Sequence, residues 1–312
     1  MLLIVPTDAP AVLDPVDGVE MLPYDPEQNL TEAHLAADAA VLWGFASPII
    51  DQLVGAPNLR WIQTLTAGPD PVLAAGFPDS VQVTTGRGFH DETVAEHTIA
   101  LTLAGLRQLP EAAAAQREHR WAAELSGFKP LHDGKTLTTL IDSRVTIWGF
   151  GSIGQACAAR FAAFGASVTG VARSAGERGG FPVVATEQVD ELLPRTDVLV
   201  LVLPKSPATD NVLDARRLAL LPAWAWVVNV GRGNAIDEEA LVAALTAGTL
   251  GGAALDVMQT EPLPSDSPLW SAPRTILTPH NAGGRPLHTR EFIGENLRRF
   301  VAGEPLRNLA TR

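Results

Sequence analysis

An arginine, a glutamate and a histidine each follow a short apolar segment in the last third of the sequence. They lie in the segments Asn229-Val230-Gly231-Arg232-Gly233, Leu255-Asp256-Val257-Met258-Gln259-Thr260-Glu261-Pro262-Leu263 and Leu277-Thr278-Pro279-His280-Asn281-Ala282-Gly283. Histidine exchanges protons near neutral pH, and a glutamate that accepts from its other ring nitrogen would favour the imidazolium. Arginine presents a planar fork to carboxylate and carbonyl oxygens. Arg232, Glu261 and His280 therefore predict proton transfer on a small anionic substrate, provided that the fold brings them together.

A glycine-rich segment lies between an apolar stretch and an alanine-rich stretch near the middle of the chain. It reads Gly149-Phe150-Gly151-Ser152-Ile153-Gly154. In a dinucleotide-binding turn the first glycine permits the tight turn, the second allows a pyrophosphate to approach, and the third allows close packing of helix on strand. The helix that begins here would offer unpaired N–H groups to the anion. A chance glycine-rich turn is the alternative, which the flanking strand and helix disfavour.

The end of the next strand bears on the choice of cofactor. An NAD site needs a carboxylate about 20 residues after the glycines to accept from the ribose 2′-hydroxyl. This strand instead ends in Arg173 and Ser174, and the first acidic residue beyond it is Glu177. Arg173 and Ser174 could hold a 2′-phosphate, with added charge from Arg178. We therefore expect NADP(H) to be preferred and NAD(H) to be possible; a solvated Arg173 is the alternative.

Short apolar segments alternate with helical segments along the whole chain, which predicts an α/β fold with parallel strands. The first third has predicted strands at 2–5, 39–43, 61–65 and 81–84, with helices at 32–37, 48–53 and 71–75. A long helix at 93–106 continues as a polar helix over 108–123. Six strands follow at 144–148, 167–172, 198–203, 226–230, 252–256 and 275–278, with a helix at 155–164 and an amphipathic helix at 285–303. Because ligands bind beyond the carboxyl ends of such strands, the three ionisable residues would meet there.

Composition and charge exclude several classes of function. The chain has 312 residues, and 23 basic against 35 acidic residues give a net charge of −12, which disfavours nucleic-acid binding. Cys157 is the only cysteine, and we expect it to be a packing residue. A single cysteine is typical of a protein in a reducing compartment and offers no cysteine metal site. The apolar residues 1–6 are too short for a signal segment or a membrane span. We expect a cytoplasmic protein that binds no metal and no membrane.

Together, the glycine turn and the three segments resemble the D-isomer-specific 2-hydroxyacid dehydrogenase family, and most closely its glyoxylate/hydroxypyruvate reductase branch. The resemblance implies that Arg232, Glu261 and His280 are catalytic, with Arg232 and His280 binding the substrate. It places Asp256 beside the nicotinamide carboxamide, whereas a generic aspartate at a strand end caps a helix. The implied cofactor contacts also include Leu203, Pro204, Val230, Gly231 and Gly283.

The resemblance extends to the first third of the chain. Thr66-Ala67-Gly68-Pro69-Asp70 looks like the family's substrate-carboxylate loop, in which the N–H groups of Ala67 and Gly68 could form an anion nest. Pro69 departs from the family pattern and removes one donor. Val94-Ala95-Glu96-His97-Thr98 looks like the helix that links the domains and forms the dimer, so a homodimer through residues 94–123 is implied. His90 and His97 are interpreted as residues of this region, away from the hydride.

These observations predict two domains with a substrate cleft between them. Residues 1–98 and 286–312 would form a flavodoxin-like substrate domain, and residues 99–285 a doubly wound Rossmann domain. Gly231 and Gly233 are expected to keep the surroundings of Arg232 open to a ligand. The predicted reaction is reduction of a small 2-keto acid, of the glyoxylate or hydroxypyruvate type, to the 2-hydroxy acid with NADPH.

Two alternatives remain open from the sequence. One is a dinucleotide-sensing regulator without enzymatic activity, which the presence of all three ionisable residues disfavours. The other is an enzyme resembling phosphoglycerate dehydrogenase that uses NAD. It is less attractive because no regulatory domain follows Arg312, but short forms exist in the family, so a short form stays open.

Overall fold

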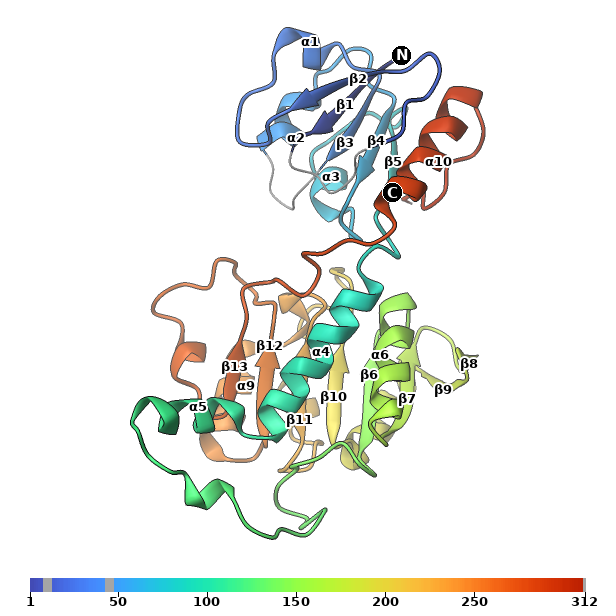
Figure 1. Cartoon of the computed structure of the whole chain (residues 1–312). Coiled ribbons are helices and arrows are strands. Elements are labelled where there is room, and N and C mark those ends of the chain that lie inside the picture. Colours follow the sequence, from blue (N-terminus) through green and yellow to red (C-terminus); the bar gives the residue numbers. More distant parts are fainter. Residues whose placement is uncertain (8–12, 43–47, 311–312) are drawn as a thin grey trace. The chain divides into compact units, whose positions relative to one another are not determined.

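The computed structural model describes residues 1–7, 13–42 and 48–310, which form two compact units. The first comprises Met1–His90 and Arg285–Arg312, and the second comprises Asp91–Gly284 (Figure 1). The domain boundaries expected from the sequence fall after residues 98 and 285. In the structure the first division comes earlier, because helix α4 (Asp91–Leu106) is continuous and belongs entirely to the second unit.

The first unit contains a parallel sheet of five strands among its described residues, in the order β2-β1-β3-β4-β5. The strands are β1 (Leu2–Pro6), β2 (Glu20–Tyr24), β3 (Ala39–Leu42), β4 (Trp61–Thr64) and β5 (Gln82–Thr84). This is the strand order of flavodoxin-like folds, so the predicted class of this unit is confirmed. Strand β2 was not predicted; it is an edge strand that contains Pro23, and proline is a poor sequence signal for a strand. Trp43, the predicted end of β3, lies outside the described residues.

Helices cover both faces of this first sheet. They are α1 (Glu32–Leu35), α2 (Pro48–Leu53), α3 (Asp70–Ala74) and α10 (Thr289–Ala302). Ile49 and Leu53 of α2 pack with Ile62 on one face. On the other face, Ile293 and Leu297 of the C-terminal helix α10 pack with Trp61. The last segment of the chain therefore completes the core of the first unit.

The second unit contains an eight-stranded sheet in the order β13-β12-β11-β10-β6-β7-β9-β8. Its strands are β6 (Arg144–Trp148), β7 (Ser167–Ala172), β8 (Gly176–Arg178), β9 (Phe181–Ala185), β10 (Val198–Leu201), β11 (Trp226–Asn229), β12 (Gly252–Leu255) and β13 (Thr275–Leu277). All pairs are parallel except β8 with β9. The doubly wound α/β class is confirmed. The expected six strands are too few, because β8 and β9 form a short hairpin whose turn, Gly179-Gly180, has two positive φ angles.

Helices α4 and α6 (Ser152–Ala163) pack together over one face of this second sheet (Figure 1). Cys157 of α6 is fully buried here, and burial raises the pKa of its thiol to about 12, so it packs as predicted. The opposite face is covered by α7 (Val189–Leu192), α8 (Ala215–Leu218) and α9 (Glu238–Ala247). The predicted continuation of α4 over 108–123 is wrong: Gln108 has a φ of 53°, and a separate helix α5 runs over Leu109–Arg117.

Short 3₁₀ segments complete the second unit, at Ala123–Leu125, Thr186–Gln188, Leu193–Arg195, Gly233–Ala235 and Pro268–Ser271. In the described part of the chain, no helix combines the length and apolarity needed to cross a membrane.

Trp226, at the start of β11, brings α4 close to the sheet. A Cβ atom on Gly105 of α4 would lie 2.3 Å from its ring, and one on Gly252 of β12 would lie 2.5 Å from it. Both distances are far below van der Waals contact, so the indole occupies the space that the two glycines leave.

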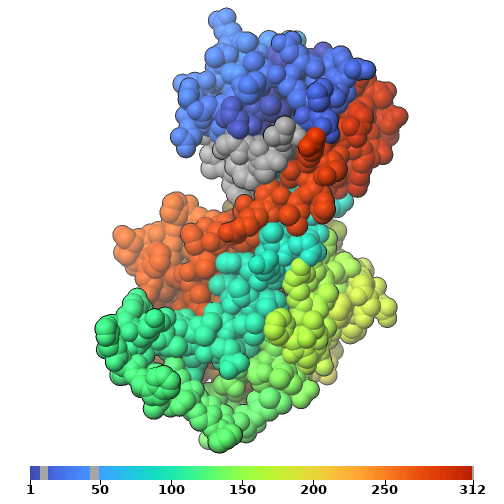
Figure 2. All heavy atoms as spheres, in the orientation of Figure 1, coloured from blue at the N-terminus to red at the C-terminus, as the bar shows by residue number. Residues whose placement is uncertain are grey.

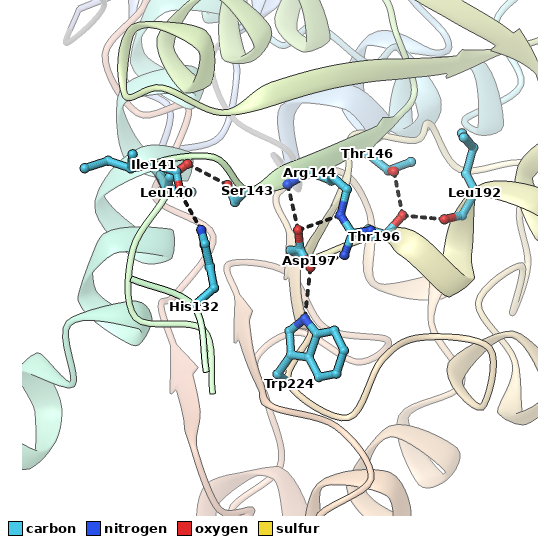
Figure 3. Close-up of polar contacts among 10 residues, drawn as sticks. All are labelled: His132, Leu140, Ile141, Ser143, Arg144, Thr146, Leu192, Thr196, Asp197 and Trp224. Atoms are coloured by element: carbon cyan, nitrogen blue, oxygen red, sulfur yellow. Dashed lines mark hydrogen bonds and ion pairs between the residues drawn. The ribbon is translucent and has the colours of Figure 1, made fainter. Parts of the chain in front are cut away.

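A polar cluster holds together the amino ends of the central strands (Figure 3). Asp197, 6% exposed, accepts hydrogen bonds from the backbone N–H and guanidinium of Arg144 at 2.8–2.9 Å and from the Trp224 indole at 2.9 Å. Beside it, the hydroxyls of Thr146 and Thr196 are 2.7 Å apart. The cluster joins β6, β10 and the segment before β11, at the edge of the sheet opposite the predicted site.

Candidate functional site

The strand order brings the predicted site segments of the second unit to one edge of its sheet. Strands β13, β12, β11, β10 and β6 are parallel neighbours, so the loops that follow them lie side by side. In that order the loops carry His280, Asp256, Arg232, Leu203 and the glycine turn. After β6 the chain adds strands on one side of it, beginning with β7, and then crosses to β10 on its other side. Such a reversal of strand order is a switch point, where ligands bind in open α/β sheets.

The three glycines of the turn have different surroundings. Gly149 has a φ of 104°, and a Cβ atom there would lie 2.2 Å from the carbonyl oxygen of Val202. A Cβ atom on Gly154 would lie 2.5 Å from the carbonyl oxygen of Gly149. Gly151, exposed at the N-cap of α6, has nothing within 4 Å of its Cβ position. The first and third glycines are therefore required for backbone packing, while the second leaves open space at the start of the helix, as a pyrophosphate requires.

Arg178 links the glycine turn to the end of β7. Its guanidinium donates to the carbonyl oxygen of Phe150 at 3.3 Å and to the hydroxyl of Ser174 at 2.8 Å. Arg173 is exposed, and its guanidinium makes no hydrogen bond with the described residues. Two arginines and a hydroxyl thus lie next to the turn, and the described residues near it fit a phosphorylated dinucleotide.

The loop that carries Arg232 is held by Asn229, a residue the sequence analysis did not single out. Asn229, 1% exposed, accepts from the N–H of Gly231 at 3.1 Å and donates to the carbonyl oxygen of Arg232 at 3.0 Å. That Gly231 and Gly233 leave the surroundings of Arg232 open to a ligand stays a prediction, but both glycines also have a packing role. Their Cβ positions lie 2.6 Å from the Leu203 nitrogen and 1.9 Å from the Met258 carbonyl carbon, so both glycines permit close packing of neighbouring loops.

The side chains of His280 and Glu261 are in direct contact. His280 Nδ1 lies 2.6 Å from Oε2 of Glu261, and the other carboxylate oxygen of Glu261 accepts from the Met258 N–H at 2.9 Å. Burial raises the pKa of Glu261, but the hydrogen bonds from His280 and Met258 and the charge of Arg232 outweigh it and hold the pKa below its usual value. Three predicted residues from three loops therefore act on one another.

Asp256 fastens the loop that carries His280. Its side chain, 1% exposed, accepts from the Thr278 hydroxyl at 2.6 Å and from the N–H groups of Asn281 and Ala282 at 3.0 Å each. Its backbone carbonyl accepts from the N–H of His280 at 2.8 Å. The carboxylate is thus occupied by the loop in the part of the chain that the structure describes.

His97 belongs to the same cluster, which differs from the interpretation that it lies away from the reaction. Its Nε2 is 3.3 Å from Oδ1 of Asp256 and 3.1 Å from the hydroxyl oxygen of Thr278. The sequence separation from Thr278 is 181 residues, so no local pattern could have indicated this contact. His90, in contrast, contacts the carbonyl oxygen of Leu65 at 2.7 Å within the first unit.

The remaining predicted residues lie in loops. Leu203 is 9% exposed, and exposed Pro204 accepts from the Thr209 hydroxyl at 2.8 Å through its carbonyl oxygen. In the first unit, Ala67 and Gly68 lie just after β4, and their N–H groups donate to no acceptor among the described residues. Val230 and Gly283 flank the Arg232 and His280 loops.

Comparison with known proteins assigns the chain to a family. Residues 99–282 match the family model described as D-isomer specific 2-hydroxyacid dehydrogenase, NAD binding domain, which covers more than half of the chain. The chain belongs to the D-isomer-specific 2-hydroxyacid dehydrogenases. The resemblance inferred from the motifs is therefore confirmed.

Individual 2-hydroxyacid dehydrogenases match most of the chain. D-3-phosphoglycerate dehydrogenase of Mycobacterium tuberculosis is 34% identical over 278 residues, which are 86% of this chain and 50% of that protein. Glyoxylate/hydroxypyruvate reductase A of Klebsiella pneumoniae is 31% identical over 86% of this chain and 85% of its own length. The crystal structure of an NADPH-dependent glyoxylate/hydroxypyruvate reductase from Sinorhizobium meliloti, in complex with NADP and sulfate, superposes with a TM-score of 0.80 at 29% identity, covering 99% and 98% of the two chains. This chain thus spans about half the length of the mycobacterial enzyme.

Proposed function

We propose that this protein reduces a small 2-keto acid of the glyoxylate or hydroxypyruvate type to the corresponding 2-hydroxy acid, with NADPH as the reductant. The contact between His280 and Glu261, 2.6 Å from Nδ1 to Oε2, carries the proposal. A histidine whose Nδ1 is held by a carboxylate is oriented to exchange a proton through Nε2. The names of the related proteins from K. pneumoniae and S. meliloti support the same reaction.

Each of the three residues has a part in the proposed reaction. A bound nicotinamide supplies the hydride for C2 of the keto acid. His280 gives a proton to the carbonyl oxygen, and Glu261 stabilises the imidazolium before that transfer. Arg232 binds the substrate carboxylate and polarises the ketone through its planar fork. In the oxidation of the alcohol, His280 accepts the proton instead.

Three features support a preference for NADPH over NADH. Arg173, Ser174 and Arg178 lie at the end of β7, where a 2′-phosphate would need charge-assisted hydrogen bonds. The first carboxylate in this segment comes only at Glu177, so the usual acceptor for a free 2′-hydroxyl is missing there. The related S. meliloti enzyme is described as NADPH-dependent.

The proposal includes the turn after β4 as an anion-binding element of the first unit. The N–H groups of Ala67 and Gly68 are its donors, and Pro69 contributes none. Thr66 donates through its hydroxyl to the carbonyl oxygen of Gly68 at 2.7 Å, which fixes the turn.

The experiment is a panel of keto acids assayed with NADPH and with NADH. We expect the highest kcat/KM for glyoxylate or hydroxypyruvate with NADPH. The panel includes pyruvate and 3-phosphohydroxypyruvate as competitors. Absence of turnover with every keto acid, in the presence of measurable dinucleotide binding, would contradict the proposal and favour a dinucleotide-sensing regulator.

A second candidate is a short phosphoglycerate dehydrogenase that uses NAD. The 34% identity to the mycobacterial enzyme favours it. A preference for 3-phosphohydroxypyruvate and NADH in the same panel would select this candidate.

We infer further that the protein is a homodimer formed through the region 94–123 and the segment that follows it. Half of the residues of α4 are buried within its own unit, and the segment that follows the helix offers further surface for a partner. Large apolar side chains are exposed along this segment, namely Leu109, Trp121, Phe128, Leu131 and Ile141. Figure 2 shows the segment, in green, forming the surface at the lower end of the second unit. Apolar side chains gathered on a surface favour association with another protein chain.

A further inference from the structure

His97 reaches the catalytic loop from a different element of the second unit. It lies on α4, whereas Asp256 follows β12 and Thr278 follows β13. Its side chain is 22% exposed, while that of Asp256 is 1% exposed. The imidazole therefore covers a carboxylate that has almost no access to water.

The hydrogen-bond pattern fixes which groups donate. The Thr278 hydroxyl lies 2.6 Å from Oδ1 of Asp256, an ionised acceptor, and so gives its proton to that oxygen. His97 Nε2 faces the same oxygen at 3.3 Å and the Thr278 oxygen at 3.1 Å. An unprotonated nitrogen would direct a lone pair at two oxygen atoms, so Nε2 must carry a proton. His97 donates to the cluster in either its neutral or its charged form.

The loop that Asp256 fastens needs this support. His280 has a φ of 51°, in the left-handed region that costs free energy for a residue other than glycine. Its N–H donates to the carbonyl oxygen of Asp256, and the next two N–H groups, of Asn281 and Ala282, donate to the carboxylate. The conformation that directs the His280 imidazole toward Glu261 is thus held by an ionised Asp256.

We propose that His97 is a positioning residue for His280, acting through the buried carboxylate of Asp256 and the hydroxyl of Thr278. An isolated carboxylate at 1% exposure is unfavourable, and each donor that it loses makes its charge harder to keep. Without His97, protonation or displacement of Asp256 would release the N–H groups of Asn281 and Ala282. The imidazole of His280 would then lose its fixed direction, although His97 itself touches no reacting atom. This inference rests on the proposed role of His280.

The test compares His97→Leu with His97→Gln, whose amide can donate from a similar position. Two kinds of measurement are made: amide hydrogen exchange at Asn281 and Ala282 without substrate, and kcat with the KM values for the preferred keto acid and for the cofactor. We expect His97→Leu to accelerate exchange at both amides about 10-fold to 100-fold, the usual effect of losing a hydrogen bond to a charged group. We expect kcat to fall with an unchanged KM for the cofactor, and His97→Gln to restore most of both quantities.

Two further variants keep the test decisive. Glu96→Gln changes an exposed neighbour on the same helix and should leave exchange and kcat unaltered. Thr278→Val removes the bridging hydroxyl at nearly constant volume and should accelerate exchange at the same two amides, even if His97→Leu does not fold.

The outcomes separate this inference from the proposed function. Equal exchange in the wild type, His97→Leu and Thr278→Val would overturn the positioning role, as would a His97→Gln variant as impaired as His97→Leu. A wild-type protein that reduces no keto acid would refute the proposed function, whereas the exchange measurement would still report whether His97 holds the loop.

Discussion

His280 combines a left-handed backbone, φ 51°, with a short contact from Nδ1 to Glu261. Its loop is fixed on both sides, by Asp256 through backbone N–H groups and by Glu261 through the side chain. In its proposed role as a proton donor, a side chain held in this way would lose little freedom when a substrate binds.

The first prediction concerns the proton transfer itself. His280→Ala should lower kcat by about 10²-fold to 10⁴-fold, the usual contribution of a general acid, and should leave NADPH affinity unchanged. Single-turnover hydride transfer and fluorescence titration with NADPH measure the two quantities separately. His132→Ala, which alters an exposed histidine at the opposite edge of the sheet, is the control. Undiminished hydride transfer in His280→Ala would remove His280 from its proposed role.

The second prediction concerns cofactor choice. Arg178→Ala removes a guanidinium that donates to both the Phe150 carbonyl oxygen and Ser174. It should weaken NADPH binding by roughly 10-fold to 100-fold, as expected for a charge-assisted hydrogen bond, and weaken NADH binding much less. Arg173→Ala should act in the same direction. Calorimetric titration of both dinucleotides, with exposed Arg195→Ala as the control, measures the difference; equal losses for the two cofactors would refute the phosphate contact.

At the scale of the element, the glycine turn separates stability from binding. Gly149→Ala would place a Cβ atom 2.2 Å from the Val202 carbonyl oxygen at a φ of 104°, whereas Gly151→Ala meets nothing within 4 Å. We expect Gly149→Ala to lower the free energy of unfolding by at least about 1–3 kcal/mol. Gly151→Ala should retain stability but weaken dinucleotide binding, because its methyl group enters the open space at the start of α6. Urea unfolding and dinucleotide titration distinguish the two; a stable Gly149→Ala variant would contradict the prediction.

The polar cluster in Figure 3 gives the second element-scale prediction. Burial raises the pKa of Asp197, but hydrogen bonds from Arg144 and Trp224 outweigh it and hold the pKa below its usual value. Because the unfolded state binds the proton more readily, this contribution is present above the ordinary aspartate pKa and is lost as the pH falls through the folded value. Asp197→Asn should therefore lower the free energy of unfolding by about 1–3 kcal/mol at pH 7 and by less near pH 3.

The measurement is urea unfolding of wild type and Asp197→Asn at several pH values. A difference in free energy that stays constant from pH 7 to pH 3 would show that the charge of Asp197 is not the cause. Asp266→Asn, which changes an exposed aspartate of the same unit, is the control.

The central strands could be predicted because buried strands are made of apolar residues, which are visible in the sequence. Strands β6 and β7 have the predicted bounds, since each is a run of apolar and β-branched residues between turn residues. Strands β2, β8 and β9 were missed: β2 and β8 are edge strands, β9 lies next to β8, and β2 and β9 contain proline. An edge strand buries fewer side chains, so its pattern is weaker.

For the candidate site, the residue types that do chemistry were visible in the sequence, but their supports were not. Arg232, Glu261 and His280 each follow an apolar strand, and a general rule brings strand ends together. Asn229 and His97 act through contacts that depend on the packing of different elements. The role of Gly233 likewise requires the position of the Met258 backbone, which only the folded chain provides.

At the scale of the whole molecule, the exposed apolar side chains in the segment that follows α4 predict an oligomer. Trp121 is 86% exposed and Phe128 is fully exposed. Replacing both by glutamate should convert the proposed dimer to a monomer without loss of secondary structure, because two charges would be buried unpaired in the interface. Sedimentation velocity measures the mass. Replacing exposed Phe164 of the second unit by glutamate is the control; a wild-type monomer at all concentrations would contradict the inference.

The packing of Trp226 between Gly105 and Gly252 limits which substitutions these three positions can accept during evolution. These three positions belong to different elements. Neither glycine can be replaced by a larger residue while the indole is present, and loss of the indole would open a void beneath α4. Substitutions at these positions are therefore expected to covary. Related sequences with a smaller side chain at 226 should carry bulkier residues at 105 or 252, and those that keep the tryptophan should keep both glycines.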